Sequence, residues 1–145
     1  MLSAGNISPI HNAAYNQCLD ADLNTMANNG TKVQLWQCNG SAQQMWKLTV
    51  YSNGTMKIQS QHSPFRCLDA DLNTIANNGT KVQLWDCNNS TQQQWDLFSL
   101  PNGNTSIESN HPPYNYLDAD LNTINRNGTK VQLWGPVGGT NQQWY

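Results

Sequence analysis

Cys67–Trp95 reads CLDADLNTIANNGTKVQLWDCNNSTQQQW, and this stretch decides the fold because it occurs three times. It appears first as Cys18–Trp46 and again, with changes, as Tyr116–Trp144; the spacing is 49 residues both times and the copies align without a gap. The first two copies are identical at 24 of 29 positions. A fixed period near 50 residues indicates a repeat architecture whose units bury a core only together.

Three copies can close around a threefold axis, so we expect one closed, pseudo-symmetric domain over residues 1–145. A single repeat is too small to stabilise itself. The expected repeats span about 5–52, 53–101 and 102–145.

Composition excludes several classes of function. A net charge of −2 and 11% charged residues give no electrostatic reason to expect nucleic acid or an anionic membrane as partner. No apolar run approaches the roughly 18–20 residues needed to cross a bilayer, so we expect no membrane insertion. Small and polar residues follow Met1–Leu2 at once, and we expect no signal peptide there. Abundant Asn, Gln, Ser, Thr and Gly favour a loop-rich, all-β protein.

The cysteines are informative because of how they are lost. Each of the first two copies has two, at the same places, and the third copy has Tyr116 and Pro136 instead. Joint loss is what a bonded pair predicts, although four buried free thiols are an alternative. No CxxC or HxxxH spacing points to zinc. Disulfides imply an oxidising, extracellular destination, which favours an excised piece of a secreted chain. The predicted disulfides are Cys18–Cys38 and Cys67–Cys87.

Strand and turn signals divide each copy into about four short strands. A first strand lies around Ile7 and Ile10, an Asn-Gly turn precedes the next, and Thr31–Trp36 alternates with period two. A polar turn follows the second cysteine, and 43–48 carries the last strand of the unit. Twelve short strands in three pseudo-symmetric units predict an all-β fold, the β-trefoil. The counterparts of the first strand are 56–58 and 106–107.

The same alternation separates two groups of tryptophans. Val33 and Leu35 should face inward, which puts Lys32, Gln34 and Trp36 on the outer face. Trp85 and Trp134 follow the same logic, with partial burial under a neighbouring loop as the alternative. The tryptophans of the Gln-x-Trp motifs should pack around the axis as core aromatics. These inward residues are Trp46, Trp95 and Trp144.

The order Cys-Leu-Asp, Gln-Leu-Trp-x-Cys, Gln-x-Trp, repeated three times, resembles the ricin B-type lectin repeat. Within that group the chain is most similar to family-13 carbohydrate-binding modules of secreted microbial enzymes. The resemblance extends from about Gly5 to Trp144 and is highly specific, because three copies are in register. It implies a β-trefoil with one shallow sugar site per repeat and no catalysis by the module itself.

The resemblance also implies residue roles, carried over position by position. Each site has an acid, a stacking tryptophan, an amide and a motif glutamine that orients the acid. The family usually has Asn at the amide position, and only Asn141 matches it. Asn39 and Asn88 lie where some members contact sugar, whereas the third copy has Val137. The implied binding residues are Asp20, Trp36, Asn39, Gln43 and Gln44 in copy one; Asp69, Trp85, Asn88, Gln92 and Gln93 in copy two; and Asp118, Trp134, Asn141 and Gln142 in copy three.

These residue types suit sugars on physical grounds. An exposed indole can cover the C–H face of a pyranose, and an ionised carboxylate accepts hydrogen bonds from two neighbouring hydroxyls. The resemblance implies galactosides or other plant and cell-surface glycans as partners, and we expect them to be bound by a monomer without cofactor or metal. The leading role is a module that targets a secreted glycoside hydrolase to polysaccharide. A free-standing lectin or haemagglutinin and a xylan-binding module are the alternatives.

Three other patterns have competing interpretations. Asp20-Ala-Asp22-Leu-Asn24 resembles the start of a calcium loop but lacks the Gly and Glu of an EF-hand, so an Asx turn is favoured. Paired acids could mark a glycosidase, yet a catalytic pair is needed once and these recur in every copy. Each Asn-Gly-Thr is a glycosylation sequon by pattern and a turn by chemistry. An enzyme or inhibitor on this scaffold would require an unmatched insertion, and none interrupts the repeats.

Overall fold

The computed structural model describes residues 2–145, which form an all-β fold with four single-turn 3-10 helices. The first repeat contains β1 (Ile7–Ser8), β2 (Cys18–Ala21), η1 (Leu23–Thr25), β3 (Thr31–Trp36), η2 (Ala42–Gln44) and β4 (Trp46–Val50). The second contains β5 (Met56–Ser60), β6 (Cys67–Ala70), β7 (Thr80–Trp85), η3 (Thr91–Gln93) and β8 (Trp95–Ser99). The third contains β9 (Thr105–Ser109), β10 (Tyr116–Ala119), β11 (Thr129–Trp134) and η4 (Thr140–Gln142).

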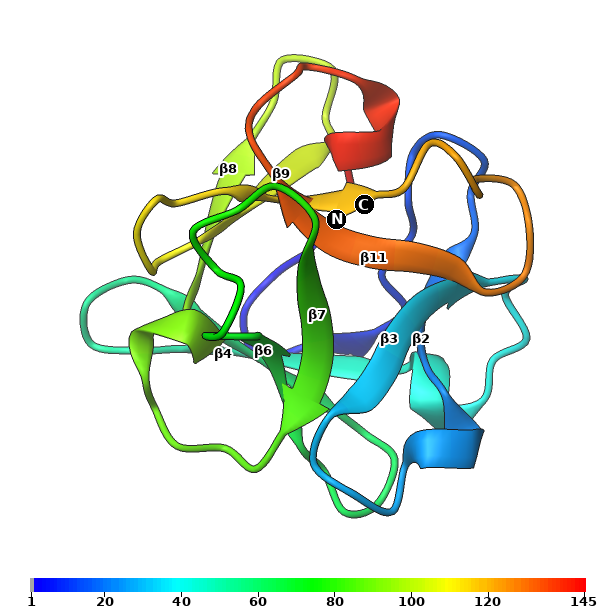
Figure 1. Cartoon of the computed structure of the whole chain (residues 1–145), viewed down its shortest axis with the longest axis vertical. Coiled ribbons are helices and arrows are strands. Elements are labelled where there is room, and N and C mark those ends of the chain that lie inside the picture. Colours follow the sequence, from blue (N-terminus) through cyan, green and yellow to red (C-terminus); the bar gives the residue numbers. More distant parts are fainter. Residues whose placement is uncertain (1) are drawn as a thin grey trace.

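Three equivalent strands surround the centre of the molecule. β3 pairs with β7, β7 with β11, and β11 with β3, all antiparallel, so the three strands close a ring (Figure 1). Each also pairs along its length with the strand before it, giving the hairpins β2–β3, β6–β7 and β10–β11 in the same register. The ring and its three matching hairpins are the pseudo-threefold arrangement of a β-trefoil, as predicted.

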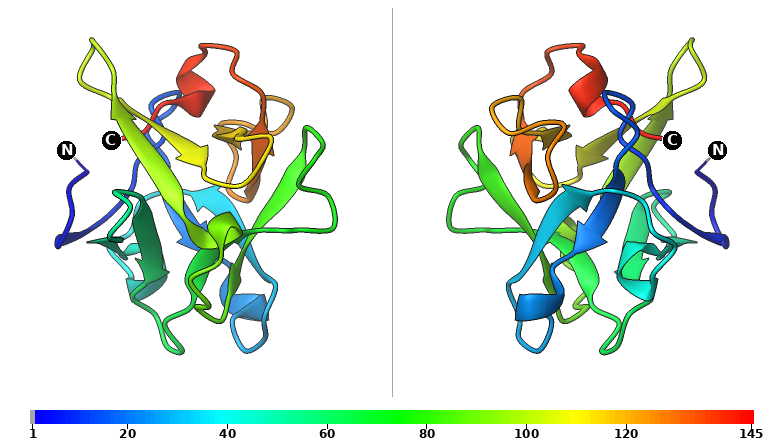
Figure 2. Two further views of the ribbon diagram at one scale, coloured as in Figure 1. Left: turned by 90° about the vertical axis from the view of Figure 1, so that its left-hand side faces the viewer. Right: turned by 90° about the vertical axis from the view of Figure 1, so that its right-hand side faces the viewer.

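A second set of hairpins joins one repeat to the next. β4 pairs with β5 and β8 with β9 over five residues each, and β1 pairs with β4. In the side views these two hairpins and both ends of the chain lie towards one side of the molecule (Figure 2). At the corresponding place in the third repeat, Trp144 makes isolated bridges to Asn12 and Thr105.

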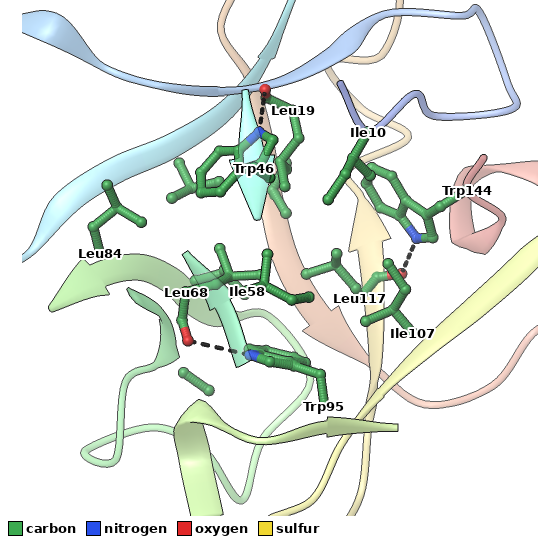
Figure 3. Close-up of a cluster of buried hydrophobic side chains, with 14 of the residues drawn as sticks. Ile10, Leu19, Trp46, Ile58, Leu68, Leu84, Trp95, Ile107, Leu117 and Trp144 are labelled. Atoms are coloured by element: carbon green, nitrogen blue, oxygen red, sulfur yellow. Dashed lines mark hydrogen bonds between the residues drawn. The ribbon is translucent and has the colours of Figure 1, made fainter. Parts of the chain in front are cut away.

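The three Gln-x-Trp tryptophans form the centre of the core, as predicted. Trp46, Trp95 and Trp144 are fully buried. Each indole Nε1–H donates to a backbone carbonyl of its own repeat, that of Leu19, Leu68 or Leu117, at 3.0–3.1 Å (Figure 3). Burial of an indole is tolerated because its single polar group is satisfied in this way.

Both predicted disulfides are present. Cys18 bonds to Cys38 and Cys67 to Cys87, each across 20 residues of sequence, and no cysteine is free among the described residues. Each bond links the start of the outer hairpin strand to the loop that follows the ring strand. None of the helices in the described part of the chain is long and apolar enough to cross a membrane.

Three details of the predicted strands are wrong. The expected strand over 43–48 begins only at Trp46, because residues 42–44 turn in a 3-10 helix first. The first strand contains only Ile7 and Ser8, and Ile10 is a buried residue outside it. Residues 2–145 therefore contain eleven strands rather than twelve, since the last one is reduced to the bridges of Trp144.

Candidate functional site

Each repeat places one aspartate at the base of a surface hollow. In the first, Asp20 on β2 lies opposite Gln34 on β3, and Gln34 Nε2 donates to Asp20 Oδ1 at 3.0 Å. Gln44 of η2 donates from Nε2 to the other oxygen, Oδ2, at 2.9 Å. The same two bonds recur at Asp69, from Gln83 and Gln93, and at Asp118, from Gln132 and Gln142.

The motif glutamine holds its position through three polar bonds. Besides its bond to Asp20, Gln44 Nε2 donates to the carbonyl of Gln37, and Gln44 Oε1 accepts the backbone N–H of Asn39 at 2.9 Å. Gln93 and Gln142 make the equivalent bonds. All three glutamines are buried and contact the carboxylate without lining the hollow. This geometry agrees with the orienting role that the resemblance implies.

Burial raises the pKa of all three aspartates above the ordinary value of 3.8. Desolvation of the carboxylate is the largest cause, and the neighbouring Asp22, Asp71 or Asp120 adds to it. The hydrogen bonds from the glutamines oppose this shift; Gln92 also approaches Asp69 and lowers its pKa. Each carboxylate is therefore desolvated yet still has acceptor positions to offer a ligand.

The predicted outward tryptophans flank these hollows. Trp36, Trp85 and Trp134 end the three ring strands, and 38%, 40% and 38% of each residue is exposed. The alternative, partial burial under a neighbouring loop, is observed as well, because a glycine of a neighbouring repeat lies against each ring. A Cβ built on Gly128 would lie 4.0 Å from Trp36, and Gly30 and Gly79 stand in the same relation to Trp85 and Trp134.

The structure brings most predicted site residues together in three hollows. The hollows of repeats one, two and three have volumes of about 520, 570 and 350 Å³. Each is lined by the aspartate, the outward tryptophan and the amide that precedes the motif glutamine. Asn39 and Asn88 line the first two, and Val137 takes that place in the third. Gln44, Gln93 and Gln142 lie behind the hollows rather than lining them.

Several residues that line these hollows lie outside the predicted set. Gln34 was placed on the outer face, but it is only 6% exposed because it lies beneath the hollow against Asp20. Its repetition as Gln83 and Gln132, always between two apolar residues, was the available signal. The lining residues outside the predicted set include Leu23, Asn24 and Gln34 and their counterparts in the other repeats, which are Leu72, Asn73, Gln83, Leu121, Asn122 and Gln132.

The second aspartate of each Asp-x-Asp-x-Asn forms a turn. Asp22 Oδ1 accepts the backbone N–H of Asn24 at 3.0 Å and caps η1. Asp71 and Asp120 do the same for Asn73 and Asn122 at 3.0 Å. The Asx turn favoured over a calcium loop is therefore the observed conformation.

Each hollow also depends on the repeat before it. The sequon asparagine Asn29 accepts, through Oδ1, the backbone N–H of Asp86, the residue that follows Trp85. Asn78 does this for Gly135, after Trp134, and Asn127 for Gln37, after Trp36. In the second repeat Arg66 adds an ion pair with Asp86 at 3.0 Å, and its Nη1 donates to the carbonyl of Met26. The asparagines thus fix the neighbouring tryptophan strand in addition to making a turn.

A further hollow, of about 370 Å³, lies beside the third repeat. It lies between β8, β9 and β10 and is lined by Phe98, Glu108, Tyr116 and Pro136, among others. Tyr116 and Pro136 occupy the two positions of the missing disulfide. This hollow holds neither a motif aspartate nor an outward tryptophan, so it differs in kind from the other three.

Comparisons with solved structures support the fold. A designed threefold-symmetric protein, ThreeFoil, is 25% identical with a TM-score of 0.86, and the match covers 95% of both chains. An exo-β-1,3-galactanase from Clostridium thermocellum is also 25% identical with a TM-score of 0.86; 99% of this chain matches only 30% of the galactanase chain. The ricin B-like lectin of Macrolepiota procera, solved with lactose, is 18% identical with a TM-score of 0.80, covering 99% and 96%.

Two comparisons of the sequence with known proteins gave different results. A search against the sequences of curated proteins finds no match. Residues 6–144 match the model of one protein family, the ricin-type β-trefoil lectin domain. That match covers all three hairpins, all three hollows and both disulfides. The chain therefore belongs to the family of ricin-type β-trefoil lectin domains.

Proposed function

We propose that this chain binds carbohydrate without catalysis, through up to three shallow sites, one in each repeat. The observation that carries the proposal is a desolvated carboxylate and a part-exposed indole lining one hollow, repeated three times. Membership of a lectin family supports the same conclusion.

The proposed binding mechanism divides the sugar between two surfaces. The indole of Trp85 covers a face of C–H groups, and Asp69 accepts hydrogen bonds from hydroxyls at the rim of the ring. Gln83 and Gln93 donate hydrogen bonds to the two oxygens of that carboxylate, so its orientation is fixed before the sugar binds. Pre-organisation of this kind lowers the entropy lost on binding. For one monosaccharide at one shallow site we expect a dissociation constant on the order of 0.1–1 mM.

Galactose-containing glycans are the proposed ligands, with xylan-type chains as the second candidate. One similar protein is an exo-β-1,3-galactanase, and another is a lectin solved in complex with lactose. The galactanase also supports a role as a module of a glycoside hydrolase, because the matched part is 30% of that chain. A free-standing lectin of one chain is the alternative, and the coverage of the Macrolepiota procera lectin supports it equally.

Three further proposals concern the location of the domain, its lack of catalysis and its oligomeric state. The two disulfides support an extracellular location, since such bonds persist in oxidising compartments. Threefold recurrence of the acids supports binding over catalysis, because an active site requires one special constellation rather than three equal ones. We propose that the domain acts as a monomer whose several sites face different parts of one glycan.

The test is a calorimetric titration with galactose, lactose, xylobiose and mannobiose at millimolar concentration, with and without a chelator. Lactose should bind, with no change on chelation because no metal is invoked. The variant Trp36→Ala/Trp85→Ala/Trp134→Ala should lose binding, and Tyr15→Ala, which changes an exposed aromatic residue outside the three hollows, should keep it. If none of these sugars binds, or if the triple variant binds as well as the parent, the proposal is wrong.

A further inference from the structure

The hollow between β8, β9 and β10, which we call the Phe98 hollow, has a lining unlike that of the three hollows that hold a motif aspartate. Its volume of about 370 Å³ lies within the range of small-molecule sites, about 300–1,000 Å³. Phe98, Tyr116 and Pro136 present apolar surface to it, and Glu108 contributes a carboxylate. The turn around η4 closes its other side (Figure 1). The rest of the lining is Leu100, Ser106, Gly138, Gly139, Gln142 and Gln143.

The negative charge at this hollow has no cationic partner in the described residues. Glu108 lies opposite Asp96 on β8 and opposite Tyr116 on β10. Residues directly opposite on antiparallel strands share one face of the sheet, so the two carboxylates and the phenol form a row. The one ion pair in residues 2–145 joins Arg66 to Asp86, away from this row. Burial raises the pKa of Glu108 above 4.5; the Tyr116 hydroxyl opposes the shift and the charge of Asp96 adds to it.

The hairpin β4–β5 occupies the equivalent place one repeat earlier and has the opposite charge. Lys47 and Gln59 stand where Asp96 and Glu108 stand in β8–β9, and Lys57 adds a second positive charge. The trefoil therefore forms with either face, and the acidic, aromatic surface is particular to β8–β9. The other differences are Thr49 for Phe98, Lys57 for Ser106, and the disulfide Cys67–Cys87 for Tyr116 and Pro136.

The amide oxygens at the edge of the hollow already accept hydrogen bonds. Gln142 Oε1 accepts the backbone N–H of Val137 at 3.0 Å. Gln143 Oε1 accepts from Asn102 Nδ2 at 2.9 Å and from Asn104 Nδ2 at 3.1 Å. A cation with several N–H groups would lose hydrogen bonds to water that such a lining replaces poorly. A fully methylated ammonium ion has no N–H to satisfy and carries its charge on an apolar surface.

We propose that the Phe98 hollow binds a trimethylammonium group, with the methyl groups against Phe98 and Tyr116 and the charge facing Glu108. A cation within about 6 Å of an aromatic ring centroid is attracted by the ring, and quaternary ammonium ions are recognised in this way. Asp96 increases the negative potential at the same place. Phe98, Tyr116 and Glu108 lie outside the three aspartate hollows, so the site is separate from the proposed carbohydrate sites.

The experiment is a titration of ¹⁵N-labelled protein with choline, followed by the backbone N–H signals of β8, β9 and β10. Two analogues separate charge from shape: 3,3-dimethyl-1-butanol has the shape of choline without the charge, and ethanolamine has the charge without the methyl groups. Each should bind about tenfold more weakly than choline or weaker still. Phosphocholine distinguishes the source of the cation. Tighter binding of choline supports a free amine as ligand, and tighter binding of phosphocholine supports a choline phosphate head group.

Substitutions within the hollow test the residues that carry the proposal. Glu108→Gln keeps the size of the side chain and removes its charge, so choline binding should weaken by about tenfold or more. Phe98→Thr introduces the residue of the equivalent hairpin and should weaken it about two- to thirtyfold. As a matched control, Lys47→Asp/Gln59→Glu places the same two acids on β4–β5 without the aromatic residues. It should leave the affinity and the number of choline sites unchanged.

A second control separates this site from the carbohydrate hollows, which also combine an acid with an aromatic ring. The variant Trp36→Ala/Trp85→Ala/Trp134→Ala should bind choline as tightly as the parent. The buried indole signals of Trp46, Trp95 and Trp144 report whether each variant keeps its fold.

Several outcomes would overturn the inference and leave carbohydrate binding intact. These are no response to choline, equal binding of choline and the uncharged analogue, equal binding of choline and ethanolamine, or an unchanged affinity in Glu108→Gln. Loss of choline binding in the triple tryptophan variant would also overturn it, because choline would then occupy the aspartate hollows. Failure of every sugar to bind would end the proposed function without affecting the choline result.

Discussion

At the scale of single residues, tryptophan does two different things within each repeat. One indole is fully buried and donates its N–H to a backbone carbonyl, as Trp95 does to Leu68 at 3.1 Å. The other, such as Trp85, ends a ring strand and leaves 40% of its surface exposed beside a carboxylate. The first contributes apolar burial to the core, and the second provides a surface on which a ligand can stack.

These two roles predict different effects of the same substitution. Trp95→Ala should lower the free energy of unfolding by about 3–5 kcal/mol, as is usual for a large core aromatic. Trp85→Ala should change it by less than about 1 kcal/mol and abolish binding in the second hollow. Urea denaturation and sugar titration of both variants check this. Equal stabilities for the two variants would contradict the separation of inner and outer tryptophans.

The raised pKa of the aspartates predicts that their contribution to stability and the affinity for sugar change with pH in opposite directions. Burial raises the pKa of Asp69 above 3.8, so the folded protein takes up this proton at a higher pH than the unfolded chain. The stability contributed by this group is therefore greatest below the unfolded pKa of 3.8 and falls as pH rises through the folded pKa. Sugar binding requires the ionised carboxylate, so it should fall as pH decreases through the same folded pKa.

Titrations with lactose at several pH values between about 7 and 4 test this. The midpoint of the loss of lactose binding in the hollow of Trp85 should lie above pH 3.8. Asp69→Asn should weaken binding at Trp85 at every pH and remove the pH dependence there, while Trp36 and Trp134 keep theirs. An unchanged lactose constant at Trp85 in the parent protein down to pH 4 would count against a role for the carboxylate.

At the scale of elements, the outer hairpins are held in two of three repeats by a disulfide. Cys67–Cys87 closes a loop of 20 residues between the start of β6 and the loop after β7. The chain-entropy model gives about 3 kcal/mol for a loop of this size, because the crosslink restricts the unfolded chain. The third repeat forms the same hairpin without the bond, so the disulfide stabilises the hairpin without determining it.

Cys67→Ser/Cys87→Ser should therefore lower the free energy of unfolding by about 3 kcal/mol and keep the fold. Denaturant curves measure the first, and the circular dichroism spectrum of the native variant checks the second. Mass spectrometry of the unreduced parent should show no alkylated cysteine. Alkylation of any of the four without reductant, or an equally stable double variant, would contradict the prediction.

Much of the element structure could be predicted because local sequence determines it. Period-two alternation located the ring strands, and Thr31–Trp36 is β3 without any shift. Joint loss of cysteines identified both bonds. The family resemblance implies the motif Asp, the outward Trp and the amide before the motif glutamine, and these residues line one hollow in each repeat.

The features that were not predicted depend on tertiary contacts, and the period-two alternation of a strand carries no information about such contacts. Gln34 alternates as an outer residue, yet η2 carries Gln44 over the same carboxylate and encloses it. The hydrogen bond from the Asp86 backbone N–H to Asn29 Oδ1 joins residues 57 positions apart in the sequence, and the closed ring brings them together. The start of the fourth strand was misplaced because Ala42–Gln44 has no proline or glycine to mark its 3-10 turn.

At the scale of the whole molecule, the repeats share their stabilising contacts. Each ring strand pairs with the ring strands of both other repeats, and each sequon asparagine accepts a hydrogen bond from the backbone just after the ring strand of the next repeat. We therefore propose that residues 1–145 fold as one domain and predict one cooperative unfolding transition, coincident by tryptophan fluorescence and circular dichroism. A fragment of residues 53–101 should be unfolded. Two separate transitions, or a folded fragment, would contradict this.

Three sites around one axis also predict that polymeric glycans bind differently from free sugars. Once one site holds a chain, a second site on the same domain binds at a raised effective concentration, which increases the apparent affinity by 10²–10⁴-fold where geometry allows. Trp85→Ala leaves the other two hollows intact, so calorimetry with free lactose should lose about one site and keep the remaining constants. On a surface densely coated with lactose the same variant should dissociate at least tenfold faster than the parent, and Trp36→Ala/Trp85→Ala faster again. A dissociation rate that does not change with the number of intact sites would show that the hollows act independently and that one of them accounts for retention on the surface.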